Sequence, residues 1–91
     1  MAVVHIPAAM RKHTNGETQA DVPGSTLGEV MEHLAALYPD LKDRLVQGDR
    51  IKPGLVVFVN GEMADVYLNT PVPEGAELYF APAIAGGQEQ C

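Results

Sequence analysis

The fold of this 91-residue chain is decided by one stretch, Thr26-Leu27-Gly28-Glu29-Val30-Met31-Glu32-His33-Leu34-Ala35-Ala36-Leu37-Tyr38-Pro39. Its apolar residues recur at the spacing of an amphipathic helix, and they are Leu27, Val30, Met31, Leu34 and Leu37. Thr26 and Glu29 have the spacing of a capping box, with the threonine as N-cap. Pro39 cannot continue a helix. The stretch therefore predicts a helix that starts after Thr26 and ends at Tyr38, with one face buried.

Short apolar runs bounded by turn residues predict strands on both sides of this helix. Asn15-Gly16 and Asn60-Gly61 are dipeptides typical of tight hairpin turns, and each stands between two such runs. Residues 40–52 are charged and mixed, and for them we expect a short helical turn and a loop. The expected strands are residues 3–6, 17–22, 55–59, 62–68 and 77–81.

A hairpin, a single crossing helix and then further strands is the plan of a β-grasp (ubiquitin-like) fold, of the α+β class. We expect a mixed sheet of about five strands, with one main helix packed across one face and the two ends of the chain adjacent at the centre. Pro82 lacks an N–H and ends the last strand. Residues 1–82 are therefore expected to form the domain, and residues 83–91 a flexible tail that contains Gly86-Gly87.

Composition limits the classes of protein to which the chain belongs. Hydrophobic residues make up 46% and charged residues 20%, as in a globular domain. A net charge of −6 disfavours nucleic acid and anionic membranes, and suits docking on a basic partner. No apolar run is long enough to span a membrane, and the first residues do not resemble a signal peptide. With one cysteine and no internal disulfide, we expect a cytoplasmic protein.

The sequence offers little chemistry of its own. The three histidines, His5, His13 and His33, lie on different expected elements, and we expect no metal site. There is no phosphate-binding glycine loop and no arrangement typical of nucleophilic catalysis. The chain alone is therefore not expected to be an enzyme.

Several segments, taken in order, resemble a known family. They are Ile6-Pro7, Thr26-Leu27-Gly28-Glu29-Val30, Leu37-Tyr38-Pro39, Arg44-Leu45, Asn60-Gly61, Pro73-Glu74-Gly75-Ala76-Glu77-Leu78 and Ala81-Pro82-Ala83-Ile84-Ala85-Gly86-Gly87. Together they resemble the ThiS/MoaD group of ubiquitin-like sulfur carriers. The N-terminal half is most similar to the CysO-type branch, whose members work in cysteine assembly and related sulfur transfers.

The resemblance implies a mechanism. In such carriers a ThiF/MoeB-like enzyme uses ATP to adenylate the terminal glycine carboxylate, and sulfur then displaces AMP to leave a thiocarboxylate. The thiocarboxylate donates sulfur to a biosynthetic enzyme, for which a PLP-dependent, cysteine-synthase-like protein is the first expectation. Gly87 is implied as the reactive residue, and Ile84, Ala85 and Gly86 as the slender segment that threads into the enzyme. The carrier itself binds no cofactor, because its partners supply the chemistry.

This sequence departs from the family pattern after Gly87. The carboxyl group of Gly87 is an amide to Gln88, and an amide cannot be adenylated as a carboxylate can. We expect a JAMM-type metalloprotease to cut between Gly87 and Gln88 and remove residues 88–91. The alternatives are a cloning remnant or an inactive carrier. Cys91 is either a discarded residue that can dimerise on oxidation, or a sulfur acceptor or cross-linking site.

The last strand predicts a docking surface. If Leu78 and Phe80 point into the core, alternation places Tyr79 and Ala81 on the opposite face. Residues 55–59 are apolar throughout, so some of them must also lie on that face. We therefore expect partners to dock around Tyr79, Ala81 and Pro82, unless loops cover this side of the sheet.

Two other functions stay open at this point. A covalent protein modifier shares the fold and the Gly-Gly, but ends as an amide on target lysines. A non-covalent interaction module, like the small subunit of molybdopterin synthase, would not need Gly86 and Gly87. The sequence does not indicate which metabolite receives the sulfur.

Overall fold

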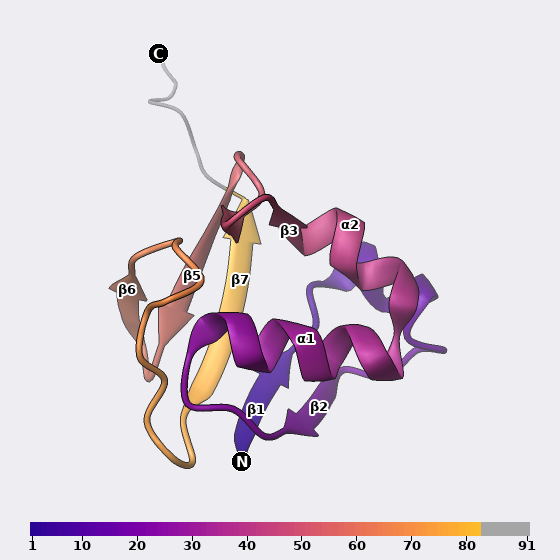
Figure 1. The fold of residues 1–91 in the computed structure, drawn as a ribbon. Helices are drawn as coiled ribbons and strands as arrows, with labels where there is room; N and C mark the ends of the chain where they lie inside the picture. The colour runs from indigo at the N-terminus through magenta and orange to yellow at the C-terminus, as the bar shows by residue number, and fades with distance from the viewer. Residues whose placement is uncertain (83–91) are drawn as a thin grey trace.

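The computed structural model describes residues 1–82 and contains a mixed five-stranded sheet with the helix α1 across one face (Figure 1). The strand order is β2-β1-β7-β5-β6. The elements are β1 (Ala2–His5), β2 (Gln19–Val22), α1 (Leu27–Leu37), β5 (Leu55–Val59), β6 (Glu62–Ala64) and β7 (Glu77–Pro82). This arrangement confirms the predicted β-grasp fold.

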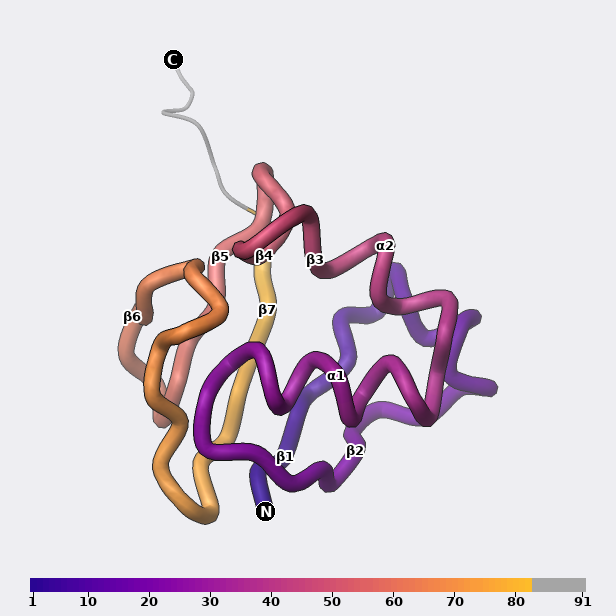
Figure 2. Tube along the Cα trace, in the orientation of Figure 1, coloured from indigo at the N-terminus to yellow at the C-terminus, as the bar shows by residue number. Residues whose placement is uncertain are grey.

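The first and last strands lie together at the centre of the sheet, as predicted (Figure 2). β1 runs parallel to β7, with Val4 opposite Leu78. On its other side β7 is antiparallel to β5, with Val57 opposite Phe80. β7 ends at Pro82, which pairs in register with Leu55, so the strand extends one residue beyond its predicted end. Proline is tolerated at such a strand end because the ladder stops there.

The start of α1 matches the predicted capping box, with one shift. Thr26 Oγ1 accepts a hydrogen bond from the backbone N–H of Glu29 at 3.2 Å. The Glu29 carboxylate reaches back to Ser25, accepting from its backbone N–H at 2.8 Å and from its hydroxyl at 3.1 Å. In the usual box the glutamate would bond the N-cap residue itself. Both ends of the motif are nevertheless satisfied, which fixes where the helix begins.

The core lies between α1 and the sheet, and one prediction about it is wrong. Leu27, Val30, Met31 and Leu34 are buried as expected, but Leu37 is 56% exposed. After Leu37 the chain turns at Pro39 into the 3-10 helix η2 (Pro39–Leu41) and the short helix α2 (Lys42–Leu45). Leu41 and Leu45 are each 1% exposed and belong to the core cluster. They fill this end of the core, so Leu37 is left at the surface.

Other differences are confined to short elements. The 3-10 helix η1 (Ala8–His13) precedes the Asn15-Gly16 turn, and the strands β3 (Val46–Gln47) and β4 (Arg50–Ile51) form a separate ribbon in the region expected to be a loop. β6 is shorter than predicted. The chain leaves the sheet after Ala64, because Ile51 and Leu68 then form backbone hydrogen bonds to Val66 and Asp49, respectively.

Within residues 1–82 no helix has the length and hydrophobicity needed to cross a lipid bilayer. The longest, α1, has 11 residues.

Candidate functional site

The face of the sheet opposite α1 carries the predicted docking residues. Leu78 and Phe80 are buried on the helix side, whereas Tyr79 is 45% exposed on the other. Ala81 is half-buried and Pro82 is exposed. The alternation predicted for the last strand is therefore confirmed.

Neighbouring strands extend this surface with apolar side chains. In the sheet register Phe58 lies opposite both Tyr79 and Met63, and Val56 lies opposite Ala81. Val56 and Phe58 are half-buried, and Met63 is 66% exposed. We call this surface the open sheet face and define it by Val56, Phe58, Met63, Tyr79 and Ala81.

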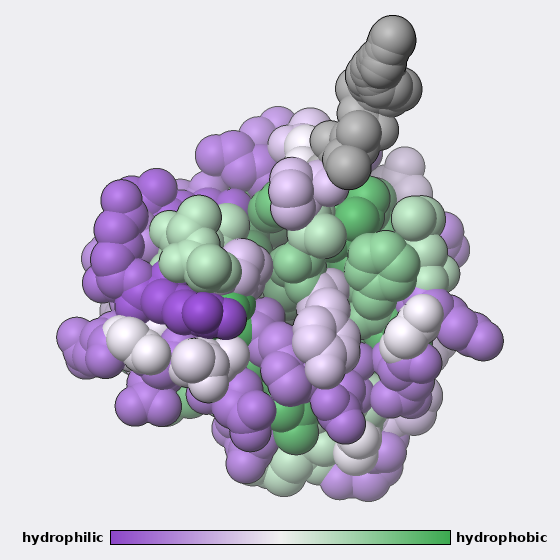
Figure 3. Space-filling view, turned by 180° about the vertical axis from the view of Figure 1, so that it is seen from behind, coloured by the Kyte–Doolittle hydropathy of each residue, from purple (hydrophilic) through white to green (hydrophobic). Residues whose placement is uncertain are grey.

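The view from behind the molecule shows that hydrophobic side chains gather on this side, towards the C-terminal end of β7 (Figure 3). An exposed apolar patch on a small domain is typical of an interaction surface. The geometry therefore favours docking over a face covered by loops.

A polar cluster borders the open sheet face on β1 and β7. The rings of His5 and Tyr79 stack with centroids 4.0 Å apart and planes inclined by 2°. His5 Nε2 lies 3.0 Å from Glu77 Oε1 and donates to it, and the Tyr79 hydroxyl donates to the same oxygen at 3.3 Å. The three side chains thus hold one another in a fixed arrangement.

The surroundings of Tyr79 stabilise the neutral form of its phenol. The pKa of Tyr79 is raised above its ordinary value of 10.0. The largest cause is desolvation of the phenol, and the smaller ones are the charge of Glu77 and the hydrogen bond to it. Tyr79 therefore remains a hydrogen-bond donor at neutral pH.

Charge is distributed unevenly along the chain. All six lysines and arginines lie between Arg11 and Lys52. Residues 53–82 contain no lysine or arginine, and their acidic residues are Glu62, Asp65, Glu74 and Glu77. None of the five strands of the main sheet contains a lysine or arginine. The open sheet face thus suits a partner with a basic surface.

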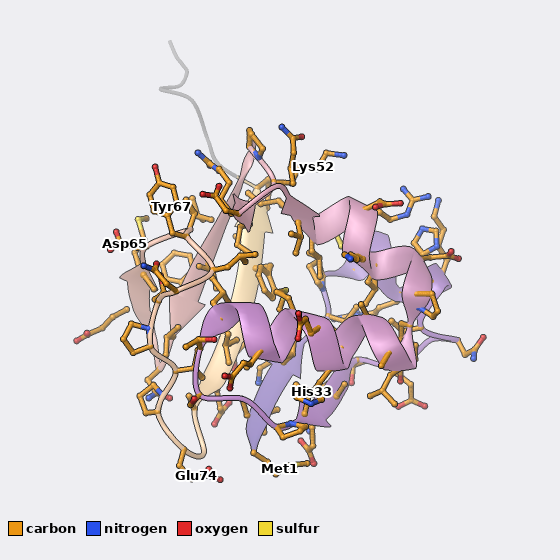
Figure 4. The ribbon with its side chains drawn as sticks, in the orientation of Figure 1. Met1, His33, Lys52, Asp65, Tyr67 and Glu74 are labelled. Atoms are coloured by element: carbon orange, nitrogen blue, oxygen red, sulfur yellow. The ribbon has the colours of Figure 1, made fainter. Side chains whose placement is uncertain are left out.

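The orientation of β7 determines where the predicted reactive segment begins. At one end of the sheet the N-terminal amine of Met1 pairs with the Glu74 carboxylate, just before β7 starts (Figure 4). β7 then runs to the opposite end of the sheet, near which Lys52 is labelled in Figure 4. The predicted residues Ile84, Ala85, Gly86, Gly87 and Gln88 lie beyond Pro82, outside the described residues.

The histidines occupy separate places. His5 bonds Glu77, His33 Nδ1 lies 2.9 Å from the Glu29 carbonyl oxygen, and His13 Nδ1 lies 3.8 Å from Asp40 Oδ2. Among residues 1–82 no three histidine, cysteine, aspartate or glutamate residues are grouped so as to hold a metal ion.

Sequence reasoning missed part of this site. The apolar run of residues 55–59 indicated that some members must be exposed, but alternation alone did not select Val56 and Phe58. The contacts between His5 and Tyr79 and between His5 and Glu77 depend on the register of the parallel strands β1 and β7. No local signal in the sequence specifies that register.

Comparisons with known proteins identify the family of this chain. The ThiS family profile matches residues 4–87. The chain belongs to the ThiS family. This match runs from within β1 to Gly87, so it includes both the open sheet face and the predicted reactive segment.

Members of the ThiS family and related folds resemble the chain throughout its length. The sulfur carrier protein CysO of Mycobacterium tuberculosis is 36% identical over 93 residues, covering 92% of this chain and 96% of CysO. A chain of the Amycolatopsis orientalis BexX/CysO complex is 33% identical with a TM-score of 0.83, covering 96% of this chain and 100% of that one. SAMP1 of Haloferax volcanii is 26% identical with a TM-score of 0.68, covering 94% and 98%.

Proposed function

We propose that this chain is a CysO-like sulfur carrier. The observation that carries the proposal is the 36% identity to the sulfur carrier protein CysO over 92% of the chain. The match to the ThiS family extends through residue 87, and so includes the Gly86-Gly87 pair. In this role the chain is a substrate of other enzymes and not a catalyst.

The reactive group is the carboxylate of Gly87 after removal of residues 88–91. A carboxylate is a poor electrophile until one of its oxygens becomes part of a leaving group. A ThiF/MoeB-like activating enzyme forms the acyl-adenylate from ATP with release of pyrophosphate. A sulfur nucleophile then displaces AMP and leaves a thiocarboxylate on Gly87. ATP is used by the activating enzyme, and the carrier needs no cofactor of its own.

The pairing of β7 in the described part of the chain supports this role. β7 pairs with β5 from Leu78 to its last residue, Pro82, and with β1 from Glu77 to Tyr79. Gly87 is the fifth residue after Pro82, which gives a reach of about 17 Å for a fully extended chain. The body can therefore dock through the open sheet face while Ile84, Ala85 and Gly86 thread towards a catalytic centre.

The acceptor of the sulfur is a biosynthetic enzyme, and a PLP-dependent, cysteine-synthase-like protein is the first candidate because of the similarity to CysO. The BexX/CysO complex is a case in which a similar chain assembles with another protein. That case supports docking of this chain on an acceptor enzyme. The acceptor is identified by testing which candidate enzyme consumes the thiocarboxylate of this chain.

Removal of residues 88–91 is part of the proposal and has a direct test. A chain truncated by Gln88→stop, the full-length chain, and the full-length chain treated with a JAMM-type metalloprotease are each mixed with the activating enzyme and ATP. Intact mass and pyrophosphate release report adenylation. The truncated and the treated chains should react, and the untreated chain should not. Adenylation of the untreated chain at Cys91 would contradict the trimming step.

Covalent modification of proteins is the second candidate. It is favoured by the similarity to SAMP1, a small archaeal modifier protein, at 26% identity. In that role Gly87 would end as an amide on a target lysine. A tagged chain expressed in its own organism distinguishes the two: Gly87–lysine branched peptides after proteolysis indicate a modifier, and a thiocarboxylate without such peptides indicates a carrier.

A further inference from the structure

A hollow of about 300 Å³ lies beside the open sheet face, and it is lined by Asn60, Gly61, Glu77 and Tyr79. Asn60 and Gly61 form the turn between β5 and β6. β1 and β5 flank β7 on opposite sides, so this hollow lies on the side of Tyr79 away from His5. Tyr79, whose ring stacks on His5, also lines the hollow.

The turn that forms one wall is held in place. Asn60 donates its backbone N–H to the Glu77 carbonyl oxygen at 2.9 Å, and its Oδ1 accepts from the Glu77 N–H at 3.1 Å. Asn60 and Gly61 have φ angles of 53° and 85°, the left-handed conformation that a two-residue hairpin turn of type I′ requires. A ligand in the hollow would therefore not have to order this wall, which lowers the cost of binding.

The carboxylate of Glu77 is also oriented. Glu77 Oε1 accepts from His5 and from Tyr79, and within residues 1–82 no side-chain or backbone donor reaches Oε2. The side chain is 55% exposed. No lysine or arginine comes from the strands around it to neutralise the charge. The hollow thus combines an aromatic residue with an oriented, accessible carboxylate that no lysine or arginine of the surrounding strands pairs with.

From this combination we infer that the hollow receives an arginine side chain of a protein that docks on the open sheet face. A guanidinium group is planar, stacks on an aromatic ring and pairs with a carboxylate, whereas an ammonium group is a compact charge that stacks poorly. Phe58 lies opposite Tyr79 in the sheet register, and Met63 lies opposite Phe58, so both offer an apolar contact to the same partner. The inference rests on the proposed function only in that a carrier must dock on other proteins.

The test uses the full-length chain and a probe that needs no sulfur chemistry. N-acetyl-arginine amide is titrated into ¹⁵N-labelled protein at physiological salt, and amide shifts are followed. N-acetyl-citrulline amide has the same length and a planar but neutral end group, and N-acetyl-lysine amide carries the charge without the plane. We expect saturable shifts centred on Asn60, Gly61, Glu77 and Tyr79, with arginine binding at least about fivefold tighter than either analogue.

Two variants identify the groups responsible. Glu77→Gln should weaken arginine binding at least about fivefold, because it removes the paired charge. Glu32→Gln removes the same charge from the exposed side of α1 and should leave binding unchanged. Equal binding of citrulline or lysine, shifts spread evenly over all acidic residues, or an unaffected Glu77→Gln variant would overturn the inference. Because no thiocarboxylate is involved, this result is independent of the adenylation test.

Discussion

Tyr79 stacks on His5, its register partner in the parallel strands β1 and β7, with ring centroids 4.0 Å apart. The contact joins the first strand of the chain to the last. It holds the Tyr79 side chain upright on the face of the sheet opposite the helix, next to Phe58. The side chain expected to contact a partner is therefore positioned before binding, which reduces the entropy lost on docking.

Replacing Tyr79 by glutamate tests whether the open sheet face is the docking surface. Tyr79→Glu puts a charge on the apolar patch beside Glu77, so affinity for the activating enzyme should fall at least about tenfold, or ~1.4 kcal/mol. Calorimetric titration measures the affinity. Because the side chain is exposed, the free energy of unfolding should change by less than about 1 kcal/mol.

The matched control is Tyr67→Glu. Tyr67 is 52% exposed in the loop after β6, which passes on the helix side of the sheet (Figures 1 and 4). The same substitution there should leave the affinity unchanged. If Tyr79→Glu binds as tightly as Tyr67→Glu, Tyr79 is not part of the docking surface.

Two leucines on α1 test the packing of the core. Leu34 is 1% exposed and Leu37 is 56% exposed. Leu34→Ala should lower the free energy of unfolding by about 2–5 kcal/mol, because it removes buried methyl groups and leaves a cavity. Leu37→Ala should cost less than about 1 kcal/mol. Denaturant unfolding measures both, and equal losses would mean that α1 is rotated from the orientation described.

The hydrogen bonds at the start of α1 predict a dependence of stability on pH. Hydrogen bonds from Ser25 lower the pKa of Glu29 below its ordinary value of 4.5. The bond from the backbone N–H has the larger effect and the bond from the hydroxyl the smaller one. A carboxylate whose pKa is lower in the folded state stabilises the protein above the unfolded pKa. That contribution is lost as the pH falls through the folded pKa.

Glu29→Gln should therefore be less stable than the wild type at neutral pH, and the difference should disappear below the folded pKa of Glu29. Denaturant unfolding at a series of pH values from neutral to acidic measures it. Glu32→Gln, from the same helix, controls for the loss of one charge. A difference between Glu29→Gln and the wild type that stays constant down to the lowest pH would show that the carboxylate charge is not what stabilises the cap.

Much of the fold was predictable because its signals are local. The spacing of Leu27, Val30, Met31 and Leu34 indicates the helix, and Asn60-Gly61 marks a hairpin turn after a buried strand. The ribbon of β3 and β4 was not predicted, because two-residue strands have no periodicity. It depends on Ile51, which is fully buried and bonds the backbone of Val66. Such tertiary contacts are not visible in the local sequence.

The site shows the same division. Alternation along β7 predicted that Tyr79 and Ala81 share the face opposite the helix. The partnership of His5, Glu77 and Tyr79 was not predicted, since it joins residues at opposite ends of the sequence through the register of β1 and β7. The exposure of Leu37 was not predicted either, because Leu41 and Leu45 compete for the core at that end of the helix.

The proposed sulfur-carrier function requires that Gly87 becomes a thiocarboxylate. The intact mass of the protein purified from its own organism, under conditions that demand sulfur, tests it most directly. We expect a species that ends at Gly87, part of which is heavier by the difference between a sulfur and an oxygen atom. Finding only the full-length chain that ends at Cys91, with no sulfur added, would contradict it.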